Sequence, residues 1–330
     1  MRILILKTTS MGDVVHALPV ATDLARFFRK DPGSLELDWV VEEQFEQLPR
    51  LHPAIDRTLA VAVRRWRQAP LAPSTWAEWQ RWRDAVRQRR YGLVLDLQGL
   101  IKSALLATQT IGPRAGFGRA TVREPMAAMA YQKRYDIDVN LHPVERMRRL
   151  AGAALGYKPE GMPVFGLRLP ADPVDEVAQF VARLDGVAFA LLLHATARAE
   201  KHWPTAHWRL LLEVFEEARR FTVLPWGNAE ERARAMRLSE GLRFALVAPA
   251  LSLGDAIWLA TKARVVAGVD TGLLHVAAAY GAPLVGIFTA TDPQRYFPYW
   301  LPRAEAVGRV GEVPTVDAVR SAIGRIGSWH

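Results

Sequence analysis

The sequence predicts an α/β protein made of two doubly wound domains, each with a parallel sheet covered by helices. Three observations lead to this fold class. The 330 residues exceed the roughly 100–200 that one domain usually holds. Short apolar runs alternate with longer stretches of helical periodicity, which is typical of repeated strand–helix–strand units. A stretch dense in Pro and Gly, residues 158–173, interrupts this alternation and predicts a linker between two halves.

The elements of the first half follow from local pattern. Its apolar runs are short and rich in Ile, Leu and Val, which favours buried strands at Arg2–Lys7, Glu36–Val41, Thr58–Val63 and Leu93–Leu97. Apolar residues at helical spacing predict helices at Val14–Arg29, Trp76–Arg90 and Lys102–Ile111. The alternation of strand and helix supports a parallel sheet, because each crossover must return the chain to the same edge.

The second half repeats this pattern. We predict strands at Phe189–His194, Thr222–Pro225, Phe244–Val247, Val265–Val269 and Leu284–Phe288. Helices are predicted at Thr205–Arg219, Ala229–Leu242, Leu253–Thr261 and Leu273–Tyr280. The resulting domains are 1–165 and 166–312. A last amphipathic stretch, Val316–Ile326, has no strand after it, so the segment 313–330 could pack back on the N-terminal domain. We expect the two domains to face a cleft that binds ligand.

Composition excludes several classes of protein. The chain has no cysteine, which excludes disulfide scaffolds, thiolate zinc sites, iron–sulfur centres and thiol catalysis. Its longest apolar stretch, 187–193, is far below the roughly 18–20 residues of a membrane span. The apolar run at the N-terminus stops at Lys7, too early for a signal peptide. We therefore expect a cytoplasmic protein, with any membrane contact peripheral.

The common sequence signatures of nucleotide and metal enzymes are absent. The chain contains no G-x-G-x-x-G, G-x-x-x-x-G-K-[ST], G-x-S-x-G or H-E-x-x-H motif. Acidic and histidine residues do not cluster with the spacing of metal ligands. These absences disfavour a nicotinamide enzyme, and we expect neither a cofactor nor a metal.

Three polar loops follow predicted strands, where α/β ligand sites form. In the first, residues 7–16, Asp13 lies beside Gly12 and could act as a general base or cap the following helix. In the second, Asp270-Thr271-Gly272 begins a helix whose backbone N–H groups could bind phosphate, with His275 one turn later. The third, 194–204, carries a hydroxyl and cations suited to a diphosphate. Capping and core packing are the structural alternatives for all of them.

A basic stretch covers residues 64–90. Eight arginines stand there against Glu78 and Asp84, with four tryptophans interleaved. Trp76, Trp79 and Trp82 have helical spacing, which indicates a stripe packed on the sheet with the arginines on the solvated face. Residues 64–67 instead follow a strand end and should face the cleft. Arginines there suit carboxylates or phosphates of a nucleic acid, an anionic lipid or an acidic sugar.

Taken together, these blocks resemble the ADP-heptose:lipopolysaccharide heptosyltransferases over nearly the whole chain. Within that family the sequence is most similar to the type I enzymes, which add the first heptose to the Kdo region of the inner core. The blocks that carry the resemblance are residues 7–13, 39–43, 64–67, 96–103, 123–125, 201–204, 224–227 and 269–275.

The resemblance implies the GT-B type of fold and an inverting, metal-independent transfer from ADP-heptose to Kdo₂-lipid A. It implies that Asp13 is the catalytic base. The residues that it implies for the donor are Thr196, Lys201, Glu230, Leu251, Asp270, Thr271, Gly272 and His275. Those that it implies for the acidic acceptor are Lys7, Arg64, Arg65, Arg67, Lys102 and Arg123. With a net charge of +9, the protein would be drawn to the anionic inner leaflet of the inner membrane.

The sequence departs from the family pattern in the donor half. Thr196 is followed by Ala197 where a second threonine is frequent, and Leu251 stands where relatives often carry Met. The loop after Gly227 is short, which leaves Glu230 and Glu231 as alternatives for the ribose. Two other functions stay open: a later heptosyltransferase of the same fold, and a basic nucleic-acid-binding protein, which lacks any recognisable binding module.

Overall fold

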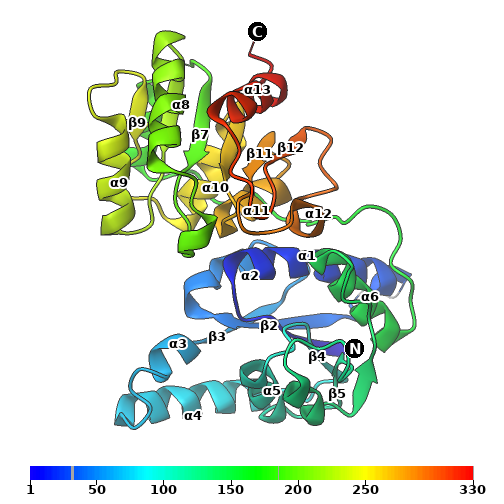
Figure 1. Ribbon diagram of the computed structural model, residues 1–330. Coiled ribbons are helices and arrows are strands. Elements are labelled where there is room, and N and C mark those ends of the chain that lie inside the picture. The colour runs from blue at the N-terminus through cyan, green and yellow to red at the C-terminus, as the bar shows by residue number, and fades with distance from the viewer. Residues whose placement is uncertain (31–32, 185, 330) are drawn as a thin grey trace. The chain divides into compact units, whose positions relative to one another are not determined.

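The computed structural model describes residues 1–30, 33–184 and 186–329, and the chain falls into two compact units, 1–168 and 169–330 (Figure 1). Among the described residues each unit holds one six-stranded sheet in which all strand pairs are parallel. The predicted α/β class with two doubly wound domains is therefore confirmed. The border between the units falls inside the predicted linker, at residue 168.

The first sheet reverses its strand order next to its central strand. Its order is β3-β2-β1-β4-β5-β6. The strands are β1 (Arg2–Leu6), β2 (Glu36–Glu42), β3 (Arg57–Val61), β4 (Leu93–Asp96), β5 (Arg114–Phe117) and β6 (Lys133–Tyr135). The chain adds strands to one side of β1 and then to the other, so the reversal lies between β1 and β4. In open α/β sheets a ligand crevice forms at the carboxyl ends of the strands at such a reversal.

Helices cover both faces of this sheet. Figure 1 shows α3 (Val63–Trp66), α4 (Pro73–Arg87) and α5 (Ile101–Thr108) on one side of it. On the other side lie α1 (Met11–Phe27), α2 (Gln47–Arg50) and α6 (Pro143–Leu155). The described part of this unit also contains the 3₁₀ helices η1 (Phe28–Lys30), η2 (Glu43–Phe45) and η3 (Pro125–Ala130).

The predicted tryptophan stripe of α4 is only partly correct. Trp82 is buried and Trp79 half-buried, and both pack with Trp66 over β1 and β4. Trp76, one turn earlier, is 54% exposed. Pro73 begins α4, so Trp76 lies in its first turn, where the prediction for its burial was wrong.

The second sheet has the same construction. Its order is β12-β11-β10-β7-β8-β9, so the reversal lies between β7 and β10. The strands are β7 (Phe189–Leu193), β8 (Phe221–Leu224), β9 (Ala245–Val247), β10 (Val265–Val269), β11 (Leu284–Ile287) and β12 (Ala304–Val307). Gly268 of β10 lies so close to β7 that a Cβ there would be 2.4 Å from the Leu193 Cβ. Only glycine permits this approach of the two central strands.

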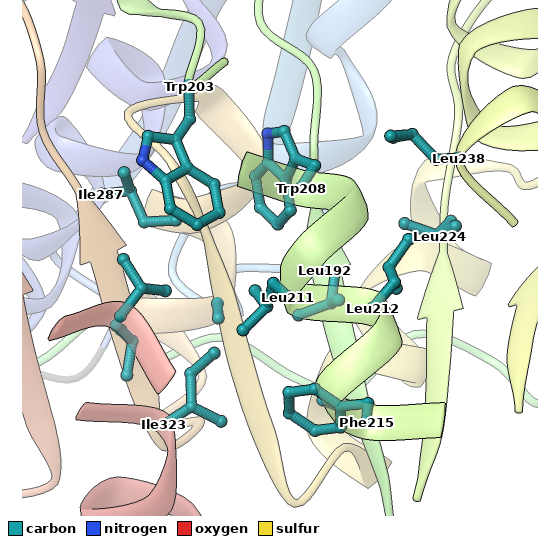
Figure 2. Packing of buried hydrophobic residues seen from close by; sticks show 14 of the residues in the cluster. Leu192, Trp203, Trp208, Leu211, Leu212, Phe215, Leu224, Leu238, Ile287 and Ile323 are labelled. Carbon is teal, nitrogen blue, oxygen red and sulfur yellow. The ribbon is translucent and has the colours of Figure 1, made fainter. Parts of the chain in front are cut away.

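Two buried clusters hold helices on the two faces of the second sheet. One joins the sheet to α8 (Thr205–Glu217), α9 (Ala229–Ser239) and α13 (Val316–Gly327). Figure 2 shows its tryptophans, Trp203 and Trp208, whose ring centroids lie 5.0 Å apart, above the leucines of α8. The other cluster joins the sheet to α7 (Asp175–Ala182), α10 (Leu253–Lys262) and α11 (Gly272–Ala279). Two short elements, η4 (Ala199–Lys201) and α12 (Pro293–Tyr296), lie in loops.

The last helix belongs to the second unit. Val319, Ala322 and Ile323 of α13 are buried in the cluster that contains Trp203, and α13 contacts β10, β11, β12 and α8. The sequence left open whether this helix packs back on the N-terminal domain; the structure places it on the C-terminal one. Its apolar stripe explains why, because the second sheet otherwise exposes that part of the face.

Buried ion pairing fixes α6 to α1. The Arg148 guanidinium donates to both carboxylate oxygens of Asp23, at 2.8 and 3.2 Å, and to the carbonyls of Glu160 and Gly161. Arg148 and Asp23 are both buried.

Replacing Arg148 by methionine is expected to lower the free energy of unfolding of the first unit by about 3–5 kcal/mol, because it leaves a buried carboxylate without its partner. Urea unfolding would measure the loss. Arg149→Met is the matched control, since Arg149 is the exposed neighbour on the same helix. Equal stability of the two variants would contradict the prediction.

Candidate functional site

The loop after β1 lies at the reversal of the first sheet. Lys7 follows the strand, is buried, and directs its ammonium toward the Leu97 carbonyl after β4, at 3.4 Å. The loop is fastened from β4 as well, since the Gln98 side-chain oxygen accepts from the N–H groups of Thr8 and Thr9. The loop then enters α1, so that Asp13 lies in the first turn of this helix.

Asp13 divides its carboxylate between two roles. Its Oδ2 accepts from the Ser10 N–H and from the Ser10 hydroxyl, both at 2.9 Å, which is the capping alternative that the sequence left open. Its Oδ1 faces the Lys7 ammonium at 3.7 Å. Burial alone would raise the pKa of Asp13, but Lys7 and the Ser10 hydrogen bonds outweigh burial and lower the pKa below its ordinary value. Asp13 is therefore a carboxylate at neutral pH.

The turn after β4 supports this loop in a way that sequence reasoning missed. The Asp96 carboxylate accepts from the N–H groups of Gln98 and Gly99 and from the Tyr131 hydroxyl, at 2.7 Å. Gly99 has a φ of +68°, which favours glycine. Gly12, beside Asp13, lies inside α1, and its φ is not positive. The Asp-x-Gln-Gly spacing could have indicated the turn after β4.

Four of the six cations expected at the acceptor gather around Asp13 and Lys7. The Lys102 ammonium donates to the Thr9 hydroxyl at 2.6 Å. Burial lowers the pKa of Lys102, and the charges of Arg64 and Arg67 lower it further. The pKa of Lys7 is lowered mainly by burial, and the positive charge of Arg123 also lowers it. These cations therefore lie around Asp13 at the carboxyl edge of the sheet, together with the buried Glu42 at the end of β2, whose charge opposes the lowering of the pKa of Lys102.

The arginines of α3 differ in what they contact. Arg65 forms ion pairs with Glu43 at 3.0 Å and Glu78 at 2.9 Å, so its guanidinium is already engaged. Arg64 and Arg67 are exposed and form no ion pair within the described residues. Of the three, Arg64 and Arg67 are therefore better placed to bind an anion, and the role of Arg65 in doing so stays a prediction.

In the second unit, Asp270 joins the two loops predicted for the donor. It follows β10 at the reversal of the sheet, and its carboxylate accepts from the Lys201 ammonium at 2.6 Å and the Thr291 hydroxyl at 2.7 Å. Its other oxygen lies 3.0 Å from His275 Nε2. Burial would raise the pKa of Asp270, but His275 and Lys201 outweigh burial and lower it. The Thr196 hydroxyl donates to the Asp270 backbone carbonyl at 3.3 Å.

The N-terminus of α11 lies at the same edge. Thr271 is its N-cap residue and Gly272 its first helical residue, both only half-buried. The first N–H groups of a helix have no partner within it and carry the positive end of its dipole. They lie at the same edge as the Lys201 ammonium, and the anion binding predicted for them stays a prediction. Thr291, which supports Asp270, was not predicted, because it lies in the loop after β11, outside every motif.

The remaining donor candidates lie further along this edge. The Glu231 carboxylate accepts a hydrogen bond from the Gly227 N–H at 2.7 Å. Glu230, in the first turn of α9, is exposed. The choice between them for the ribose stays open. Leu251 precedes α10 and packs, half-buried, on the core of the second unit. Its role at the donor stays a prediction.

Two negative findings apply to the described residues only. Within them, His, Asp and Glu side chains do not gather in threes at a spacing that could hold a metal ion. Across residues 1–30, 33–184 and 186–329, none of the helices is long and apolar enough to cross a bilayer.

Comparison with known proteins connects this geometry to one family. The profile of glycosyltransferase family 9 (heptosyltransferase) matches residues 79–322. Lipopolysaccharide heptosyltransferase 1 of Pseudomonas aeruginosa is 42% identical over 296 residues, covering 89% of this chain and 80% of the relative. The protein of the same name from Escherichia coli K12 is 40% identical over 297 residues, covering 89% of each.

Solved structures agree along the whole chain. The Escherichia coli heptosyltransferase WaaC with ADP-2-deoxy-2-fluoro heptose superposes with a TM-score of 0.84 at 36% identity, covering 98% of this chain and 99% of that one. Heptosyltransferase II of the same organism shares the fold, with a TM-score of 0.77 at 18% identity. The resemblance drawn from the motifs and the predicted GT-B fold are thereby confirmed. The chain belongs to glycosyltransferase family 9, the heptosyltransferases.

Proposed function

We propose that this glycosyltransferase moves L-glycero-D-manno-heptose from ADP-heptose to a Kdo residue of Kdo₂-lipid A, in the inner core of lipopolysaccharide. The observation that carries the proposal is the likeness, over 89% of the chain, to proteins named lipopolysaccharide heptosyltransferase 1. The structure of a relative with ADP supports the choice of donor. Each unit also offers cations suited to an anionic substrate: Lys201 in the second unit for the diphosphate of the donor, and the lysines and arginines of the first unit for the acidic acceptor.

The proposed step is a direct displacement. The acceptor hydroxyl oxygen bonds to the anomeric carbon of the heptose as the bond from that carbon to the phosphate oxygen breaks. ADP leaves with the electron pair, and the hydroxyl proton passes to the Asp13 carboxylate. This displacement inverts the configuration of the anomeric carbon. It requires a general base for the hydroxyl proton, and the ionised Asp13 carboxylate can act as that base.

The donor half supplies charge for the leaving group. A departing diphosphate gains negative charge, which the Lys201 ammonium and the N–H groups at Thr271 and Gly272 would stabilise. Asp270 is itself negative, so we assign it to holding Lys201 and His275 in place and not to contacting the phosphates. We propose that these groups act without a metal and that the enzyme needs no cofactor.

The acceptor half supplies cations for an acidic sugar. Kdo₂-lipid A carries carboxylates and phosphates, and Lys7, Lys102, Arg64, Arg67 and Arg123 lie at the edge that holds Asp13. A carboxylate bound to Lys7 would weaken the hold of that ammonium on Asp13. The pKa of Asp13 would then rise toward its ordinary value, which makes it a stronger base when the acceptor is bound.

The pH dependence of kcat/KM tests the link between Lys7 and Asp13. Because the pKa of Asp13 is lowered, the base is ionised throughout pH 5–8, and its protonation should not reduce kcat/KM in that range. In Lys7→Met, burial remains and the opposing charge is gone, so the pKa of Asp13 should rise and an acid limb should move upward toward neutral pH. An unchanged acid limb in this variant would contradict the coupling.

The reaction itself is tested by ADP release from ADP-heptose with and without Kdo₂-lipid A. Release that requires Kdo₂-lipid A is expected. Release only with a heptosylated core would reassign the chain to a later heptosyltransferase of the same fold. Failure to bind ADP-heptose at all would overturn the proposed donor.

A further inference from the structure

Four large apolar side chains are exposed near each other on the first unit. Ile101 and Leu105 of α5 are 41% and 59% exposed, and Met126 and Met129 of η3 are 68% and 77% exposed. Residues four apart on an α-helix, and three apart on a 3₁₀ helix, lie on one side of it. Each pair therefore points to one side of its own helix. These four residues are named the apolar patch below.

The two helices that carry the apolar patch are packed together and fixed. α5 and η3 contact each other, and the Ile101 N–H donates to the Glu124 carboxylate at 2.6 Å. The Glu124 N–H in turn donates to the Gly99 carbonyl at 3.1 Å. The opposite sides of both helices are buried through small residues, including Ala104, Ala107, Ala127 and Ala128. The exposure of the patch is therefore a property of folded, packed elements.

Cations border the apolar patch. Arg119 and Arg123 precede η3, Lys133 and Arg134 follow it, and all four are exposed. Within the described residues none of the four forms an ion pair. The one carboxylate of the intervening segment, Glu124, is engaged by backbone N–H of Ile101. Exposed apolar side chains beside unpaired cations are what an anionic bilayer surface binds, through lipid chains and headgroup phosphates respectively.

The apolar patch is also continuous with the site. Ile101 is adjacent to Lys102, which donates to Thr9 in the loop that holds Asp13. Arg123 borders the patch and acts on the pKa of Lys7. We propose that the apolar patch inserts into the surface of an anionic bilayer and brings the Asp13 edge to a lipid-anchored acceptor. The orientation toward the acceptor rests on the proposed function, whereas binding of the bilayer does not.

Sedimentation with lipid vesicles tests the binding directly. Vesicles of phosphatidylcholine with 30% phosphatidylglycerol, containing no acceptor, should bind the full chain at low salt. The double variant Leu105→Ser with Met129→Ser should bind about tenfold more weakly or worse, because two apolar side chains no longer enter the lipid. Leu210→Ser with Met162→Ser is the matched control, with the same residue types at 50% and 63% exposure elsewhere, and should bind like the wild type.

A charge variant separates the two contributions. Arg119→Gln with Lys133→Gln should weaken binding about fivefold for each charge at low salt, and less as salt screens the surface. Wild-type protein that fails to bind, or a Leu105→Ser/Met129→Ser variant that binds fully, would overturn the proposal. So would lipid-free self-association that this variant abolishes, because the patch would then be an interface between two copies.

Activity distinguishes this proposal from the proposed function. With a Kdo acceptor that lacks acyl chains, Leu105→Ser/Met129→Ser should release ADP as fast as wild type. With Kdo₂-lipid A in vesicles it should be slower at low enzyme concentration, through KM more than kcat. Vesicle binding without ADP release from any acceptor would refute the proposed function and leave the apolar patch as a lipid-binding surface.

Discussion

Asp13→Asn is expected to lower kcat by about two to four orders of magnitude, because the variant has no carboxylate to take the acceptor proton. Asparagine is chosen over alanine since its side-chain oxygen can still accept from the Ser10 N–H, as Asp13 does at 2.9 Å. The first turn of α1 should then stay capped. Asp13→Ala removes both functions and should in addition lose about 0.5–2 kcal/mol of stability. Single-turnover ADP release and urea unfolding would be measured for both variants.

The chain contains its own control for this experiment. Ser252 and Asp255 at the start of α10 repeat the Ser10–Asp13 arrangement, with the Ser252 N–H donating to Asp255 at 2.9 Å. Asp255 lies in no proposed site, so Asp255→Asn should leave kcat unchanged. Near-normal turnover of Asp13→Asn would mean that Asp13 is only a cap. The same conclusion would follow if Asp13→Asn and Asp255→Asn lost turnover equally and in proportion to their loss of stability.

The sequence predicted β1 to β4 and β7 to β11, including the edge strands β3 and β9, and missed β5, β6 and β12. β5 is an inner strand, but it begins with Arg114 and contains Gly116, so it has no apolar run. β1, β7, β10 and β11 are continuous apolar runs, because both of their faces are buried. β6 (Lys133–Tyr135) and β12 (Ala304–Val307) lie at sheet edges, are short, and carry no apolar run that could signal a strand. α6 was also missed, although Pro143 at its start and Gly156, with φ +78°, at its end are ordinary helix signals.

The candidate site was predictable where a motif followed a strand. Lys7 and Asp13 lie together at the edge of one sheet, and Lys201, Asp270 and His275 at the edge of the other, as expected because the carboxyl ends of parallel strands meet at one edge of a sheet. Their roles in the reaction stay predictions. Side chains that support these residues from other loops were not predicted. Thr291, which donates to Asp270, and Gln98, which fastens the loop of Asp13, act through pairings that only the folded chain establishes. Local sequence also could not show that Arg65 is engaged by Glu43 and Glu78.

Lys201→Met is expected to weaken ADP binding by about 10- to 100-fold, the range for loss of a charged hydrogen-bond partner. The loss has a second source. Asp270 keeps its contacts with His275 and Thr291 in this variant, so the turn should stay folded while its carboxylate loses the ammonium 2.6 Å away. An uncompensated negative charge would then face the negative diphosphate. Calorimetric titration with ADP would measure the change, with the exposed Lys262→Met as control.

The double variant Lys201→Met with Asp270→Asn separates these two sources. If Asp270 acts by holding Lys201, its neutralisation should cost little once Lys201 is gone, and removing the repulsion should restore part of the ADP affinity. The two substitutions would then be non-additive, as expected for groups in direct contact. Strictly additive losses would instead mean that Asp270 contacts the donor independently. Unchanged ADP affinity in Lys201→Met alone would mean that Lys201 does not bind the donor. The N–H groups at the N-terminus of α11 would then have to stabilise the charge of the diphosphate without it.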